Sequence, residues 1–124
     1  EHLRSWYRYR ASTLDVDFDG FVQAIISPTP PDWAHIGSQL NFLTDRHGTL
    51  GITHLFAYEA QPAMREWIST RMGEDVTFKP QNISPPAPTT ISPQTIAAFG
   101  SAYAAAIALH ACVTAANGHL VTPR

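Results

Sequence analysis

Cysteine is nearly absent from this chain, since Cys112 is the only one among 124 residues. A single cysteine cannot form an internal disulfide, so a disulfide-stapled secreted scaffold is excluded and a reducing, cytoplasmic compartment is the simpler expectation. The chain also has no large excess of positive or negative charge: it contains eight Lys and Arg and ten Asp and Glu, so its formal net charge is -2. This balance does not supply the basic surface on which non-specific nucleic-acid binding depends, so nucleic acid is not an expected partner.

Complete catalytic and ligand-binding motifs are also missing. The chain has no Gly-x-Ser-x-Gly elbow, no glycine-rich phosphate loop and no Gly-x-Gly-x-x-Gly fingerprint, and its first ten residues lead us to expect no signal peptide. None of the six histidines stands at zinc-ligand spacing from another histidine or from Cys112, so no metal is expected. His54, within an apolar run, is interpreted as a hydrogen-bonded strand histidine, with a catalytic base as the alternative. Motif spacing alone therefore identifies no active site, and the catalytic residues are unknown.

The composition does support a folded domain. With 44% hydrophobic and 15% charged residues, the chain can bury an ordinary core, and its length suits one domain over residues 1–124. Residues 1–11 predict a helix, because Leu3, Trp6 and Tyr7 recur on one side while Arg4 and Arg8 project from another.

Three aspartates alternate with other residues in the segment that follows, at Asp15, Asp17 and Asp19. A calcium loop needs a glycine at its sixth position and a bidentate Glu at its twelfth. Counted from Asp15, the sixth position is Gly20 but the twelfth is Ile26. The segment is therefore interpreted as the start of a short amphipathic helix, capped by Asp17 or Asp19.

The middle of the chain predicts a strand followed by a helix. Closely spaced prolines make residues 27–31 a loop that ends the preceding helix. Residues 51–58 are compact, apolar and β-branched at their start, which indicates a buried strand. Pro62 then opens a helical pattern that Gly73 closes. This order favours an α/β protein over an all-helical bundle.

A proline-rich loop over residues 82–93 leads into an alanine-rich closing helix over residues 93–116. Ser92 supplies its N-cap, and Asn117 and Gly118 supply its stop. Residues 95–116 are long enough to span a membrane and carry no formal charge apart from a protonated His110. Flanking Lys and Arg anchors are missing, and a single aromatic stripe suits packing on a sheet, so a buried helix and no membrane are expected.

The first helix also offers a candidate anion site, formed by Arg4, Ser5, Arg8 and Arg10. Helix dipoles, a hydroxyl and planar guanidinium groups together suit a phosphate or a sulfate. The alternative is a solvated helix face on which Ser5 is inert.

The same residues resemble a known family. Residues 1–10, EHLRSWYRYR, are similar to the sulfotransferase helix that follows an Arg-x-Pro and reads Ser-Trp-Tyr-x-(Phe/Tyr)-Arg. In that family the serine of this helix, together with the upstream arginine, binds the 3′-phosphate of the donor 3′-phosphoadenosine 5′-phosphosulfate. Ser5 matches the serine, and the arginine falls before Glu1.

Later segments extend the resemblance to bacterial sulfotransferases over roughly residues 1–112. Residues 33–59 are similar to a family segment in which Gln-x-x-Phe-Leu-x-Asp leads into a strand ending in Phe-x-(Tyr/Phe)-Glu. The resemblance gives Tyr58 a role against the donor adenine and Glu59 a structural one. Asn82 and Ser84 match an Asn-x-Ser motif. The C-terminal helix departs from the family, with Ala106 at an aspartate position.

The resemblance implies the C-terminal portion of a three-layer, P-loop-like, helix-rich sulfotransferase fold, without the N-terminal donor-loop half and its catalytic base. The parent enzyme would move a sulfuryl group to a hydroxyl or amine of a carbohydrate or small molecule, with no metal. Arg4 and Arg8 would add positive potential beside Ser5, Asn82 and Ser84 would lie on a loop closing the site, and the proline-rich stretch would border the acceptor entrance. The alternative is a non-catalytic α/β interaction domain, in which that stretch contacts a protein partner.

Overall fold

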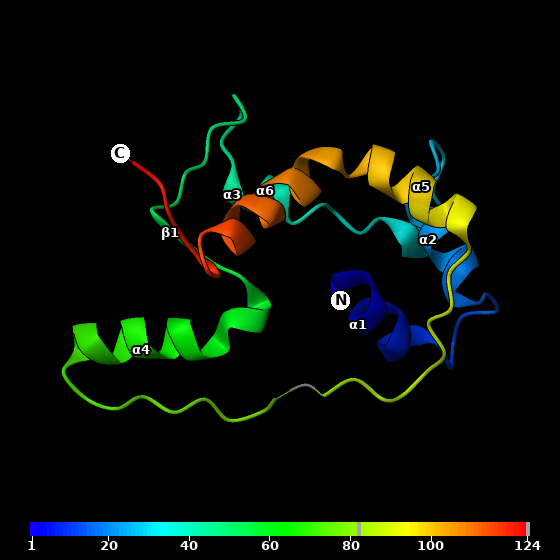
Figure 1. Cartoon of the computed structure of the whole chain (residues 1–124). Helices are drawn as coiled ribbons and strands as arrows, with labels where there is room; N and C mark the ends of the chain where they lie inside the picture. Colours follow the sequence, from blue (N-terminus) through cyan, green and yellow to red (C-terminus); the bar gives the residue numbers. More distant parts are fainter. Residues whose placement is uncertain (82, 124) are drawn as a thin grey trace. The chain divides into compact units, whose positions relative to one another are not determined.

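The computed structural model describes residues 1–81 and 83–123 and shows a small, helix-rich protein of mixed α/β class (Figure 1). Its contacts divide the chain into two compact units. Unit 1 comprises Glu1–Gly37 and Gln81–Ala104, and unit 2 comprises Ser38–Pro80 and Ala105–Arg124. Each unit is therefore built from two separate stretches of sequence. The expectation of a single domain stays a prediction.

Among its described residues, unit 1 contains three helices and one 3-10 turn, which surround an aromatic core. The helices are α1 (His2–Arg10), α2 (Phe18–Ile26) and α5 (Pro93–Ala102), and the 3-10 turn is η1 (Asp32–Ala34). Helix α2 packs against α1, η1 and α5. Seven hydrophobic residues are buried together: Leu3, Tyr7, Phe18, Phe21, Val22, Ile25 and Ala34.

Phe21 lies at the centre of this core and is completely buried. Its ring centroid is 5.4 Å from that of Tyr7 and 5.7 Å from that of Trp33, so helix α1 and η1 meet the same side chain. Leu3 and Tyr7 are the buried residues of α1, as predicted, but Trp6, which was predicted on the same side of the helix, is 38% exposed. Ring contacts of this kind add to the free energy gained from burying apolar area.

Helix α2 begins and ends where its sequence predicts. Asp17 is the N-cap, and its carboxylate accepts a hydrogen bond of 2.8 Å from the Gly20 backbone N–H. The helix ends at Ile26, and Ser27 is already extended just before Pro28. The cap satisfies a backbone donor that the first helical turn leaves without an intrahelical partner.

Asp19, the other residue predicted as a possible cap of α2, instead bonds the residue that precedes helix α5. Its carboxylate accepts a bond of 2.6 Å from the Ser92 backbone N–H and one of 2.8 Å from Gln23 Nε2. The bond from Ser92 is the main reason that the pKa of Asp19 lies below its ordinary value. Ser92 in turn caps α5 by accepting from the Thr95 N–H at 3.2 Å, as predicted.

Unit 2 contains a two-stranded sheet and the helices beside it. Strand β1 (His54–Phe56) pairs antiparallel with β2 (His119–Val121), in the register His54 with Val121 and Phe56 with His119. The other elements are α3 (Leu40–Leu43), the 3-10 turn η2 (Tyr58–Ala60), α4 (Gln61–Met72) and α6 (Ala104–Ala115). Gly73 ends α4 with a φ of 72°, as its sequence predicts.

The strand predicted over residues 51–58 is shorter than expected. Only residues 54–56 are β, because β2 offers three pairing residues. The sheet is also antiparallel, and its second strand lies after Gly118, where the sequence predicted no element.

The predicted closing helix over residues 93–116 is wrong as one continuous element, because Tyr103 separates α5 from α6. Tyr103 leaves the helical region at φ -113° and ψ 23°, while its N–H still bonds the Phe99 carbonyl at 2.9 Å. Its ring stacks on that of Phe99, at 4.6 Å between centroids, and both pack against the core of unit 1. The alanine-rich sequence on both sides of Tyr103 contains no helix-stop signal that would have predicted this break.

Across residues 1–81 and 83–123, no helix taken singly has the length and apolar character needed to cross a membrane. Helices α5 and α6 meet that criterion only together, as a bent pair, and only by length and composition.

Candidate anion-binding site

The side chains of Ser5 and Ser84 meet on the surface of unit 1. Their Oγ atoms lie 2.9 Å apart, within hydrogen-bonding distance, although 79 residues separate them in the sequence. Ser5 projects from the exposed face of α1, opposite the buried Leu3, and half-buried Ser84 belongs to the proline-rich segment. Two hydroxyls held this close can donate to the same acceptor group.

Arg4 and Arg8 extend from α1 toward a common carboxylate. Arg8 Nη1 donates to Glu1 Oε1 at 3.0 Å, and Arg4 Nη1 lies 3.9 Å from Glu1 Oε2. The two arginines therefore project together, as their spacing predicts. Both ion pairs are solvent-exposed and hence weak, so an anionic ligand can compete with Glu1 for these guanidinium groups.

Arg10, by contrast, has a structural role. Its guanidinium lies over the Trp6 ring at 4.6 Å from the centroid, and its Nη1 donates to the Trp33 carbonyl at 3.0 Å. These contacts tie the last turn of α1 to η1 and keep this cation away from the pair of arginines earlier in the helix.

Two of the predicted site residues cannot be added to this arrangement. Asn82 lies outside the described residues. Tyr58 belongs to unit 2, where it begins η2 directly after β1 and is 74% exposed. An exposed ring at the end of a strand is available for stacking, and its role against adenine stays a prediction.

Glu59, expected to have a structural role, pairs with α6. Its Oε2 lies 3.6 Å from His110 Nε2. The pKa of Glu59 is lowered, first by a backbone hydrogen bond within the residue and then by the hydrogen bond and charge of His110. The contact links η2 to α6 inside unit 2.

His54 is a hydrogen-bonded strand histidine, in agreement with the sequence interpretation. Its Nδ1 lies 3.0 Å from Nε2 of His119 on the neighbouring strand. The sequence predicted no strand after Gly118, so His119 was not predicted as the partner of His54. The available signal was the apolar run of Leu120 and Val121 just after an Asn-Gly turn.

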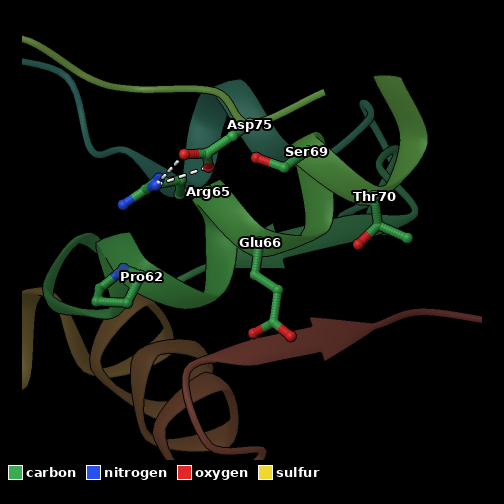
Figure 2. A pocket seen from close by; sticks show the side chains of 6 residues that line it. All are labelled: Pro62, Arg65, Glu66, Ser69, Thr70 and Asp75. Carbon is green, nitrogen blue, oxygen red and sulfur yellow. Dashed lines mark hydrogen bonds and ion pairs between the residues drawn. The ribbon is translucent and has the colours of Figure 1, made fainter. Parts of the chain in front are cut away.

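A hollow of about 320 Å³ lies along α4 in unit 2 (Figure 2). Arg65 is the cationic group on its wall, and Figure 2 shows the guanidinium directed at Asp75. Arg65 Nη2 donates to both Asp75 carboxylate oxygens, at 2.7 and 2.9 Å, and Nε donates to the Val76 carbonyl at 2.6 Å. Because Nε and Nη2 of Arg65 are engaged in this way and Asp75 already balances its charge, the hollow is a poorer anion site than the surface around Ser5. Six residues line the hollow: Pro62, Arg65, Glu66, Ser69, Thr70 and Asp75.

Within the described part of the chain, no three His, Cys, Asp or Glu side chains gather in a metal-binding arrangement. Comparisons with protein-family models, with curated proteins and with solved structures find no match for this chain.

Proposed function

We propose that this chain is the C-terminal portion of an α/β sulfotransferase with a three-layer, P-loop-like fold, and that unit 1 binds the 3′-phosphate of 3′-phosphoadenosine 5′-phosphosulfate. The contact between Ser5 and Ser84 carries the proposal. These two serines come from separate sequence motifs that both resemble the sulfotransferase family, and the fold of unit 1 brings their hydroxyls together.

The surroundings of the two serines suit a phosphate. Ser5 lies in α1 between Arg4 and Arg8, whose guanidinium groups lie on the exposed side of the helix. Guanidinium groups donate in a planar fork that matches two oxygens of a tetrahedral anion, while hydroxyls donate to single oxygens. Two cations and two hydroxyls can thus share the oxygens of one dianion.

The chemical contribution of these residues is binding and orientation. Sulfuryl transfer resembles phosphoryl transfer, in which the protein mainly positions the reactants and stabilises charge. Ser5, Ser84 and the two arginines hold the nucleotide by its 3′ end, remote from the bond that breaks. Binding energy from that remote group lowers the barrier by fixing the geometry of the reacting one.

The remaining roles follow the resemblance. By the resemblance, Tyr58 has a role against an adenine base, Asn82 belongs to the same sequence motif as Ser84, and the acceptor is a carbohydrate or small molecule with a free hydroxyl or amine. The exposure of Tyr58 supports this role, because a ring that is 74% exposed has a face available for a base.

Calorimetric titration with adenosine 3′,5′-bisphosphate tests the proposal. We expect saturable binding by the whole chain, and binding at least about tenfold weaker for Ser5→Ala, which loses a charge-assisted hydrogen bond. Glu1→Gln should bind up to a few-fold more tightly, because it releases Arg4 and Arg8 from a competing carboxylate.

Two controls make the test specific. Adenosine 5′-monophosphate lacks the 3′-phosphate and should bind equally to the wild type and to Ser5→Ala. Ser101→Ala removes an exposed hydroxyl of α5 that bonds only the Ala97 carbonyl, and it should leave affinity unchanged. Absence of binding by the wild type, or equal affinity of wild type and Ser5→Ala, would overturn the proposal and favour a non-catalytic interaction domain.

A further inference from the structure

We propose that His54 and His119 form a two-histidine binding site for a divalent transition-metal ion of the zinc and copper class. The site lies in unit 2, on the sheet formed by β1 and β2, and does not depend on the proposed sulfotransferase function. Its basis is the placement of two imidazole nitrogens, Nδ1 of His54 and Nε2 of His119, at 3.0 Å from each other.

That separation fits two neighbouring ligands of a single ion. With metal–nitrogen bonds of about 2.0–2.1 Å, cis ligands are about 2.9 Å apart at a right angle and about 3.3 Å apart at the tetrahedral angle. The observed distance lies between these values. An ion that replaces the shared hydrogen bond lies to one side of the line between the two nitrogens, so each ring turns to direct its lone pair at the ion.

The sheet register explains why the two rings converge. Phe56 pairs with His119 across the strands, and His54 lies two residues before Phe56, so all three side chains share one face. His119 stacks on Phe56 with 4.0 Å between ring centroids. This stacking holds the plane of the His119 imidazole nearly parallel to the Phe56 ring.

Trp67 of α4 covers the same face. Its ring centroid is 4.6 Å from that of His54 and 6.3 Å from that of His119. Both histidines are nevertheless only half-buried, so water can complete the coordination of a bound ion. An aromatic wall on one side and solvent on the other give a pre-positioned but open site.

The proton balance of binding is simple. In the metal-free pair, one imidazole donates its N–H to the other. When the ion binds both nitrogens, the donor ring moves that proton to its second nitrogen, so two neutral imidazoles remain and no proton is lost. Imidazole nitrogens suit zinc and copper better than magnesium or calcium, which prefer oxygen.

Zinc titration followed by NMR of the histidine side-chain nitrogens tests this site while both of its histidines stay in place. We expect saturable shifts at His54 Nδ1 and His119 Nε2 with zinc concentrations below about 1 mM, and no shifts with magnesium. The whole chain should carry His2→Gln, because a histidine beside the first residue and its amino group can itself bind metals.

Variants then separate the site from adventitious binding. His54→Gln and His119→Gln should each weaken zinc binding at least about tenfold, whereas His47→Gln, at an exposed turn, should not. Circular dichroism checks that each variant stays folded. The proposal is overturned if the wild-type ring nitrogens do not respond to zinc, or if folded His54→Gln binds as tightly as wild type.

Discussion

At the scale of single residues, the carboxylate of Asp19 connects two helices of unit 1 that are distant in the sequence. This carboxylate accepts one hydrogen bond from the Ser92 backbone N–H and another from the Gln23 side-chain amide. It thereby joins α2 to the start of α5, which comes more than 70 residues later in the sequence. An ionised acceptor forms stronger bonds than a neutral one, so this contact depends on the charge of Asp19.

Replacing Asp19 by Asn should lower the stability of the chain at pH 7. The pKa of Asp19 is depressed in the folded state, so its contribution is complete above the ordinary value of 3.8 and is lost as the pH falls through the lowered pKa. Urea midpoints of wild type and Asp19→Asn should therefore differ at pH 7 and converge in acid.

Asp15→Asn provides the matched control, because Asp15 is an exposed aspartate in the same segment. Its urea midpoint should follow that of the wild type at every pH. A constant difference between wild type and Asp19→Asn down to pH 2 would contradict the role given to the Asp19 charge.

Some residues of the candidate site could be placed together from the local sequence, and others could not. The shared face of Arg4 and Arg8 follows from helical spacing alone, and their common contact with Glu1 agrees with it. The meeting of Ser5 with Ser84 does not follow from any local pattern, because a loop of 79 residues can close in many ways. Only the resemblance placed both serines in one site.

At the scale of elements, the turn between α6 and β2 depends on Gly118. Its φ is 82°, and the preceding Asn117 also has a positive φ of 55°. Its N–H bonds the Val113 carbonyl at 2.9 Å, and its carbonyl accepts from Ala57 at 2.9 Å. A Cβ added here would collide with the Cβ of Ala60. The turn therefore aligns β2 with β1 only while residue 118 has no side chain.

Gly118→Ala should destabilise the chain by about 2 kcal/mol or more, because it combines an unfavourable φ with a steric clash. Urea denaturation measures this loss. Gly100→Ala serves as the opposite control: Gly100 lies within α5, has no atom near its added Cβ, and should gain about 0.5–1 kcal/mol. Equal stability of Gly118→Ala and wild type would contradict the clash.

The helix ends that depend on neighbouring residues were predicted correctly from the sequence. The break in the closing helix and strand β2, which depend on residues far away in the sequence, were not. Asp17, Gly73 and Ser92 end or begin their helices through bonds within a few residues, and sequence shows such bonds directly. The break at Tyr103 arises from packing against the core of unit 1, and β2 exists only because β1 pairs with it. Neither partner is visible in a local window of sequence.

At the scale of the whole molecule, buried apolar side chains are unevenly distributed. Among the described residues, seven of the eight buried hydrophobic ones form the core of unit 1, and Val113 alone belongs to unit 2. Because burial of apolar area is the main source of stability, unit 2 has less to hold it together.

Hydrogen exchange should therefore show two levels of protection. We expect amides of β1 and β2 to exchange at least about tenfold faster than those of α2 around Phe21, since local opening costs less where few apolar contacts break. Mass spectrometry of peptides from the two units measures this difference. Matching protection in both units would mean that they open together and would contradict the expectation.

The division of each unit into two stretches of sequence also affects how the chain matures during translation. Ser84 and helix α5 complete unit 1 only after all of residues 38–80 have been synthesised, and β2 closes the sheet of unit 2 last. A chain that ends between β1 and β2 would leave β1 with an unpaired edge. Exposed strand edges of this kind promote aggregation and are bound by chaperones.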